Sequence, residues 1–273
     1  MTRWMVALLA LAGGGAQAAG WTQPAGDLYV KVWGRSLIGK GVYTADGDVK
    51  ELPELFVDEA LSVYGELGLV EGLTLLVAGT PIGFARYGDE STTYVGPLSL
   101  GLRAGLPVGQ TRLALAVTAG EAPDVGEEVL GTGQAEGVDF VYVPTVATRF
   151  ATAALEVGQP LSFGWLAATG GLRLSGRTGL DPVIIGSAQL GWQTTPTVQL
   201  DFHLNLHEPM GEVEVTNVAG AGQTRYLGVG IGVSWWFSPA WALAGGFEGV
   251  AYAASNAATP TLSLGLEHRG SLW

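Results

Sequence analysis

Residues 226 to 237 read Tyr-Leu-Gly-Val-Gly-Ile-Gly-Val-Ser-Trp-Trp-Phe, and this stretch decides the fold class. Every odd position is apolar: Leu227, Val229, Ile231, Val233, Trp235 and Phe237. Three of the even positions are glycine: Gly228, Gly230 and Gly232. A period of two puts successive side chains on opposite faces of a β-strand. A helix hairpin over residues 227 to 254 is the rival interpretation, but each interior glycine would cost it about 1 kcal/mol relative to alanine.

The same alternation recurs through the chain in twelve segments long enough for a tilted strand to cross a bilayer. The predicted spans are 27–43, 57–69, 73–85, 94–106, 111–120, 139–157, 161–174, 183–194, 197–207, 225–237, 241–252 and 261–270. Pro144 interrupts the sixth span, and Leu161, Phe163 and Trp165 are out of phase with Leu172 in the seventh. A β-bulge would explain each irregularity, and ten or fourteen strands are the alternatives.

The connections between these segments alternate in length. Short turns are predicted at residues 70–72, 107–110, 158–160, 195–196 and 238–240, and longer polar segments at about 44–56, 86–93, 121–138, 175–182, 208–224 and 253–260. Bacterial barrels have short periplasmic turns and longer external loops. An open strand edge in lipid leaves backbone groups unpaired, so the sheet must close. The sequence therefore predicts an all-β fold, a closed antiparallel transmembrane β-barrel of twelve strands over residues 19–273.

The first eighteen residues predict a cleaved signal peptide. Arg3 precedes an apolar stretch from Trp4 to Leu11, and Ala16-Gln17-Ala18 supplies small side chains for cleavage after Ala18. The apolar stretch is too short to span a bilayer, although an uncleaved anchor helix is the alternative. We therefore expect export to the outer membrane of a Gram-negative bacterium, with outer-membrane lipids, lipopolysaccharide and the barrel-insertion machinery as partners. The terminal Trp273 resembles the C-terminal aromatic residue that this machinery reads.

Composition excludes several other classes of protein. The chain has a net charge of −12, which argues against nucleic acid as a partner. It has no cysteine, so the fold holds without disulfides.

Trp192, Trp235, Phe237 and Trp241 fall near predicted periplasmic turns, where an aromatic girdle would lie at the lipid headgroups.

If the apolar positions face lipid, the opposite positions line a polar lumen of mixed charge. The inward set is Lys31, Arg35, Tyr64, Glu66, Ser99, Arg103, Arg112, Glu156, Arg173, Asp201, His203, Asn205, His207, Glu248, Glu267 and Arg269. After closure, Lys31 and Arg35 are expected beside Glu66, Glu267 and Arg269. Such charges either satisfy one another structurally or form a constriction that filters solutes. The constriction candidates are Lys31, Arg35, Glu66, Arg103, Asp201, His203, His207, Glu248, Glu267 and Arg269.

Twelve tilted strands give a backbone diameter of roughly 24 Å, which inward side chains largely fill. A narrow passive channel for small molecules is therefore expected rather than a broad porin. Gly228, Gly230 and Gly232 would leave a bare inner wall and are the candidates for the path. That wall could accept a slender ligand, an inward loop or bulky side chains from the opposite wall.

The stripe Asp201, His203, Asn205 and His207 raises the alternative of a barrel hydrolase, with His203 as an oriented base and Ser187 or Ser263 within reach. No motif supports a nucleophile, so an enzyme is not the favoured prediction. The two histidines are about 13 Å apart along a strand, too far to share a metal. No cofactor and no metal are expected. A structural or surface-binding barrel with a plugged lumen is the third hypothesis.

Two predicted external loops are acidic: Asp46, Asp48, Glu51 and Glu54 in the first, and Glu121, Asp124, Glu127, Glu128 and Glu136 in the third. Runs of this kind are usually solvated loops. They could also bind calcium or attract cations to the mouth, although their spacing matches no ordered calcium site.

Several short motifs resemble outer-membrane proteins of the phenol-degradation MetA-pathway type. They are the start at residues 21–26 (Trp-Thr-Gln-Pro-Ala-Gly), Tyr64–Leu69 running through a turn into Leu73–Leu75, residues 131–134 (Gly-Thr-Gly-Gln), and Leu190-Gly191-Trp192 before Thr195-Pro196. The resemblance implies a barrel that admits small, often aromatic or hydrophobic compounds. It supplies no catalytic residues.

Overall fold

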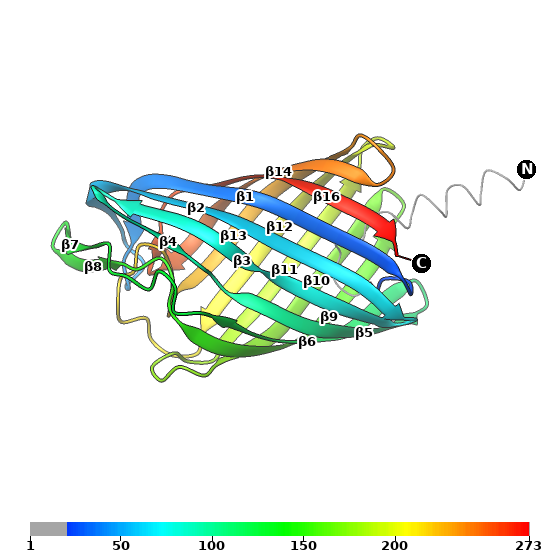
Figure 1. The fold of residues 1–273 in the computed structure, drawn as a ribbon, viewed down its shortest axis with the longest axis horizontal. Coiled ribbons are helices and arrows are strands. Elements are labelled where there is room, and N and C mark those ends of the chain that lie inside the picture. Colours follow the sequence, from blue (N-terminus) through cyan, green and yellow to red (C-terminus); the bar gives the residue numbers. More distant parts are fainter. Residues whose placement is uncertain (1–20, 273) are drawn as a thin grey trace, which may run out of the picture.

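The computed structural model describes residues 21–272, and in that part of the chain twelve long antiparallel strands form one barrel (Figure 1). The predicted signal peptide and Trp273 lie outside the described residues. The barrel strands are β1 (Asp27–Tyr43), β2 (Val49–Val70), β3 (Leu73–Tyr87), β5 (Leu98–Val108), β6 (Thr111–Ala122), β9 (Thr148–Leu161), β10 (Gly164–Ser175), β11 (Val183–Gln193), β12 (Val198–Pro209), β13 (Arg225–Trp236), β14 (Trp241–Ala254) and β16 (Thr261–Ser271).

The first and last strands close the sheet. β1 pairs with β2 on one side and with β16 on the other, so that Lys31 lies between Tyr64 and Glu267. Two short strands extend the sheet beside the ring: β4 (Glu90–Tyr94) pairs with β3, and β15 (Asn256–Ala257) pairs with β1. The prediction of twelve strands is confirmed, and the alternatives of ten or fourteen are wrong.

Three predicted strand boundaries are corrected. The sixth span divides at Pro144 into β8 (Val138–Tyr142) and β9, because proline cannot donate to the ladder. The seventh span needs no bulge: β9 continues to Leu161, β10 begins at Gly164, and their pairing is regular, so the turn lies at residues 162–163 rather than 158–160. The fourth span also divides, into β4 and β5.

The outward face of the barrel is apolar, as the alternation predicts. On β13, Val229 and Ile231 are 44% and 52% exposed, whereas the alternate residues Gly228 and Gly230 are buried. Trp192, Trp235, Phe237 and Trp241 are all exposed and lie near the short turns, the position expected of an aromatic girdle. Among residues 21–272, no helix is long and apolar enough to cross a membrane.

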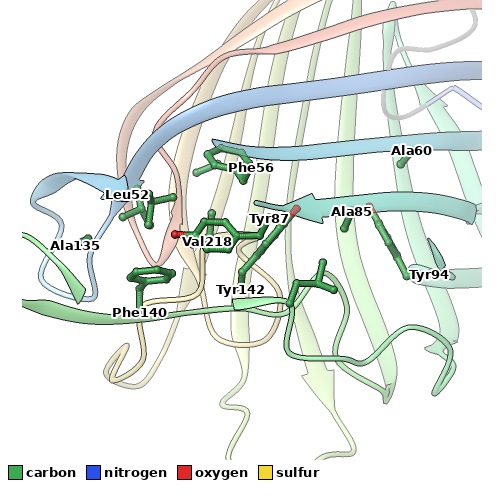
Figure 2. Close-up of a cluster of buried hydrophobic side chains, with 13 residues drawn as sticks. Leu52, Phe56, Ala60, Ala85, Tyr87, Tyr94, Ala135, Phe140, Tyr142 and Val218 are labelled. Carbon is green, nitrogen blue, oxygen red and sulfur yellow. The ribbon is translucent and has the colours of Figure 1, made fainter. Parts of the chain in front are cut away.

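The external end carries an ordered cap instead of loose loops. β2 begins at Val49, so the first loop is shorter than predicted, and a hairpin of β7 (Gly131–Ala135) and β8 lies beyond the barrel (Figure 1). Leu52 and Phe56 of β2 pack with Tyr87, Phe140 and Tyr142 in a buried cluster (Figure 2). Val218 from the long segment after β12 joins the same cluster. Burial of these apolar side chains explains why the sheet extends past the membrane-spanning part.

Candidate functional site

The innermost charges form a buried network toward the short-turn end of the lumen. Arg103 of β5 donates from Nη1 to Glu66 of β2 at 2.6 Å and from Nε to Glu156 of β9 at 2.6 Å. All three side chains are less than 10% exposed. Tyr64 also donates a hydrogen bond to Glu66. Because two carboxylates share one guanidinium with close contacts, the network fixes three strands to one another across the inner wall.

The segment that precedes β1 lies inside this end of the barrel. Gln23 donates from its backbone to the Thr74 hydroxyl at 2.8 Å and from its side chain to Glu66 at 2.6 Å. The carbonyl of Trp21 accepts from Arg103 at 3.1 Å. Pro24 covers Gly68 so closely that a Cβ there would lie 1.8 Å from the proline oxygen. Residues 21–26 therefore narrow the lumen at its short-turn end.

The expected neighbours of Lys31 and Arg35 are partly corrected. Lys31 pairs with Glu267 at 3.3 Å, as predicted from closure. Arg35 instead contacts Asp58 at 3.1 Å and the hydroxyl of Tyr94 at 3.1 Å, and Glu66 belongs to the Arg103 network. Arg35 and Glu66 lie at different levels along the barrel axis, because Arg35 is paired with Ala60 on β2, several residues from Glu66.

Arg269 lies near the short-turn rim, where its guanidinium stacks 4.0 Å from the Trp236 ring and Nε donates to the Pro239 carbonyl at 2.7 Å. The contact with the ring and turn places Arg269 away from the lumen centre. Arg269 is close enough to Glu267 to interact with it electrostatically, as expected from closure, but its closest contacts are with the ring and the turn.

The histidine stripe forms a second polar network. His203 Nδ1 lies 2.8 Å from Asp201, its Nε2 lies 3.2 Å from Glu248, and Asn205 donates to Glu248 at 2.7 Å. His207 lies further along β12 and stacks on Tyr226 at 5.5 Å between ring centroids. The stripe thus divides into a carboxylate-bound histidine and an aromatic pair.

The side chains of this network cover the glycines of β13. The expectation that these glycines leave a bare inner wall is therefore wrong. A Cβ on Gly230 would lie 2.2 Å from His203 Nε2, and a Cβ on Gly232 would lie 2.1 Å from an Asp201 oxygen. Gly228 is covered in the same way by Glu248 at 2.9 Å. The glycines provide room for side chains from the two adjacent strands, β12 and β14, rather than from the opposite wall.

The contacts of His203 also bear on the hydrolase hypothesis. Both ring nitrogens lie beside carboxylates. Ser187 and Ser263 line the same cavity as His203, but within residues 21–272 neither hydroxyl is hydrogen-bonded to the imidazole. A serine nucleophile activated by His203 would need that contact.

Three cavities follow one another inside the barrel. The external one, which we call the vestibule, has a volume of about 410 Å³ and is lined by Arg35, Arg173, His207, Tyr226 and Glu248 among others. The His203 cavity, of about 260 Å³, and the Arg103 cavity, of about 330 Å³, share Lys31, Trp33, Ser187 and Gln189. Glu248 lines the vestibule and His203 lines the second cavity, and their contact at 3.2 Å joins the linings of the two cavities. A series of cavities with polar groups in their linings is an arrangement suited to small solutes.

Sequence reasoning missed Asp58, Tyr94 and Gln23 as members of the lumen networks. Asp58 has the same parity as Tyr64 and Glu66 on β2, so alternation alone could have found it. Tyr94 lies on the extra strand β4 and donates to Asp58 at 2.9 Å, a contact that depends on external pairing. Gln23 precedes the first strand, and no periodicity could have placed it.

The acidic segments are more structured than predicted. Glu51 and Glu54 lie on β2, and Glu136 lies in the β7–β8 turn, where its carboxylate is 3.7 Å from Lys50. Glu127 pairs with Arg177 at 2.6 Å. In the described part of the chain, no group of three or more His, Asp or Glu side chains has the geometry to hold a metal ion.

Comparison with known proteins supports the fold. The chain is similar to the COG4313 outer membrane channel from Pseudomonas putida F1, with a TM-score of 0.67, 13% identity, and coverage of 92% of this chain and 98% of that one. It is also similar to the translocator domain of the autotransporter NalP from Neisseria meningitidis, with a TM-score of 0.53, 14% identity, and coverage of 97% and 94%. No protein-family model and no curated protein matches the sequence. The fold is that of outer-membrane β-barrels.

Proposed function

We propose that the protein is a passive outer-membrane channel for small molecules. The observation that carries the proposal is the series of three lumen cavities, two of which share four lining residues while the third meets them at the Glu248 and His203 contact. A barrel with a purely structural role would gain stability by filling this volume with apolar side chains. The polar lining instead suits hydrated or amphiphilic solutes.

The size of the cavities restricts the solute class. Volumes of about 260 to 410 Å³ match small organic molecules rather than oligosaccharides or peptides. The resemblance to MetA-pathway barrels favours small hydrophobic or aromatic compounds. Lipopolysaccharide and outer-membrane lipids would surround the barrel, and the insertion machinery would assemble it. The proposed activity involves no catalysis.

Two levels would control passage. The first is the level of the Glu248 and His203 pair, and the second is the level of Arg103, Glu66 and Glu156 with residues 21–26. Fixed charges at a narrow level select ions by sign. Glu248→Gln removes one negative charge at the first level and should lower the permeability of cations relative to anions.

Planar-bilayer recording of the purified protein tests the proposal. The wild type should conduct, and Glu248→Gln should shift the reversal potential in a salt gradient toward anion selectivity. Glu208→Gln is the matched control, because Glu208 lies on the external part of β12 beside Arg225 and outside the three cavities. Absence of both conductance and solute flux in the wild type would contradict the channel.

One observation favours a plugged barrel as the second candidate function: residues 21–26 occupy the short-turn end of the lumen. Replacement of Gln23 by Ala removes its side-chain hydrogen bond to Glu66 and loosens this segment. A channel predicts a measurable wild-type current that Gln23→Ala increases. A plugged structural barrel predicts no current in either protein.

A further inference from the structure

Arg173 differs from the other arginines of the lumen in what it contacts. It lies on β10, between Thr152 of β9 and Val183 of β11, and lines the vestibule. Its guanidinium carbon is 3.9 Å from the centroid of the Phe150 ring. A contact with the face of a ring uses none of the five guanidinium N–H donors. The donors of Arg173 therefore remain available to the cavity.

No carboxylate oxygen among residues 21–272 lies within 4.0 Å of the Arg173 nitrogens. Arg35 and Arg103, by contrast, each have a carboxylate partner at 3.1 Å or less. The two acidic side chains that line the vestibule already have partners. Asp181 accepts from Gln223 at 2.8 Å, and Glu248 accepts from Asn205 at 2.7 Å.

The surroundings of Arg173 combine polar donors with an apolar wall. His207 and Tyr226 stack on each other and lie close enough to Arg173 to interact with it electrostatically. Phe150, Leu180 and Val250 contribute apolar surface to the same cavity. The cavity of about 410 Å³ has the size of a small-molecule site, and its lining offers both polar groups and apolar surface.

We propose that the vestibule binds small monocarboxylates with an apolar body, and that Arg173 binds the carboxylate. The planar guanidinium matches a carboxylate with two parallel hydrogen bonds. The apolar body would lie against the wall that includes Phe150 and Leu180. This inference deepens the proposed function by naming the chemistry of a solute at the external entrance, and it rests on that function only for the subsequent passage.

The charges around the cavity define what the site excludes. A cation would meet an unpaired guanidinium, which repels it. A second anionic group on the ligand would approach Asp181 or Glu248, which also line the cavity. The site should therefore prefer one negative charge, and benzoate should bind better than its neutral isostere benzamide or the dianion phthalate.

Equilibrium binding to the purified, detergent-solubilised barrel tests the site independently of transport. Isothermal titration with sodium benzoate at fixed ionic strength should show binding to the wild type. Arg173→Gln should weaken it about 10- to 100-fold, the loss expected when charged hydrogen bonds are removed. Arg173→Lys keeps the positive charge but loses the planar guanidinium, so its affinity for benzoate should lie between those of the wild type and Arg173→Gln. Arg149→Gln is the control, because Arg149 is on the neighbouring strand with its side chain 88% exposed.

The outcomes separate the site from the channel. Equal affinity of the wild type for benzoate and benzamide, or unchanged benzoate affinity in a folded Arg173→Gln protein, would overturn the site. The ligand comparison uses wild-type protein, so it stands even if a variant fails to fold. Benzoate binding without flux into liposomes would support the site and contradict the channel. Conductance without benzoate binding would support the channel and contradict the site.

Discussion

Each end of the lumen contains a buried or lining arginine, and the contacts of these two arginines differ. Toward the short turns, Arg103 is 7% exposed and contacts two carboxylates, a tyrosine and a backbone carbonyl. In the vestibule, Arg173 contacts the face of one phenylalanine ring and opens onto a cavity. A fully paired buried charge stabilises the structure around it, while an unpaired charge beside a cavity is available to a ligand. The difference assigns a mainly structural role to one end and a binding role to the other.

The largest effect is expected from Arg103→Met. The substitution leaves Glu66 and Glu156 buried without their cation, which should lower the free energy of unfolding by about 3 to 5 kcal/mol. Arg173→Met should change it by at most about 1 kcal/mol, since no buried partner loses its charge. Urea unfolding of the barrels in lipid vesicles, followed by tryptophan fluorescence, measures both. An equal decrease in the free energy of unfolding in the two variants would contradict the different roles assigned to the two arginines.

Much of this contrast is readable in the sequence. Strict alternation placed Glu66, Arg103, Glu156 and Arg173 on the inner face, because a period of two allows only two faces. Alternation does not give the relative height of residues on strands far apart in sequence. That height depends on register and tilt around the whole ring, so the pairing of Arg103 and the isolation of Arg173 could not be predicted.

A smaller effect tests the middle of the lumen, where His203 covers the glycines of β13. Gly230→Ala places a Cβ 2.2 Å from His203 Nε2, so the imidazole must move, and overpacking of this kind costs about 1 to 3 kcal/mol. The same unfolding assay should show that the double variant Gly230→Ala, His203→Ala recovers part of the loss. Additive losses in the double variant would show that these two residues do not compete for the same space.

The smallest effect concerns the external cap. Tyr142 is fully buried and donates to the Val57 carbonyl at 3.0 Å. Tyr142→Phe should cost about 0.5 to 1.5 kcal/mol locally, because it removes one buried hydrogen bond. Hydrogen exchange of the β7–β8 amides should then accelerate while that of β5 and β6 stays unchanged. Uniform acceleration through the barrel would indicate that the cap and the barrel unfold as one unit.

The cap also marks a limit of sequence analysis. Leu52 and Phe56 share the inward parity of β2, but Pro53 and the acidic residues beside them are typical of a loop. Their burial depends on Phe140, Tyr142 and Val218, which come from segments far along the chain. Long-range packing of this kind overrides local propensity, so the extension of β2 was predicted as a loop.

The most direct test of the channel is chemical modification of one lumen position during recording. Ser187 lines both inner cavities, and the natural chain has no cysteine, so Ser187→Cys gives a single reactive thiol. A small charged methanethiosulfonate reagent added to the conducting variant should reduce its current, while Phe202→Cys, at a lipid-facing position, should be unaffected. Current through Ser187→Cys that persists unchanged after modification, confirmed by mass spectrometry, would contradict passage through this lumen.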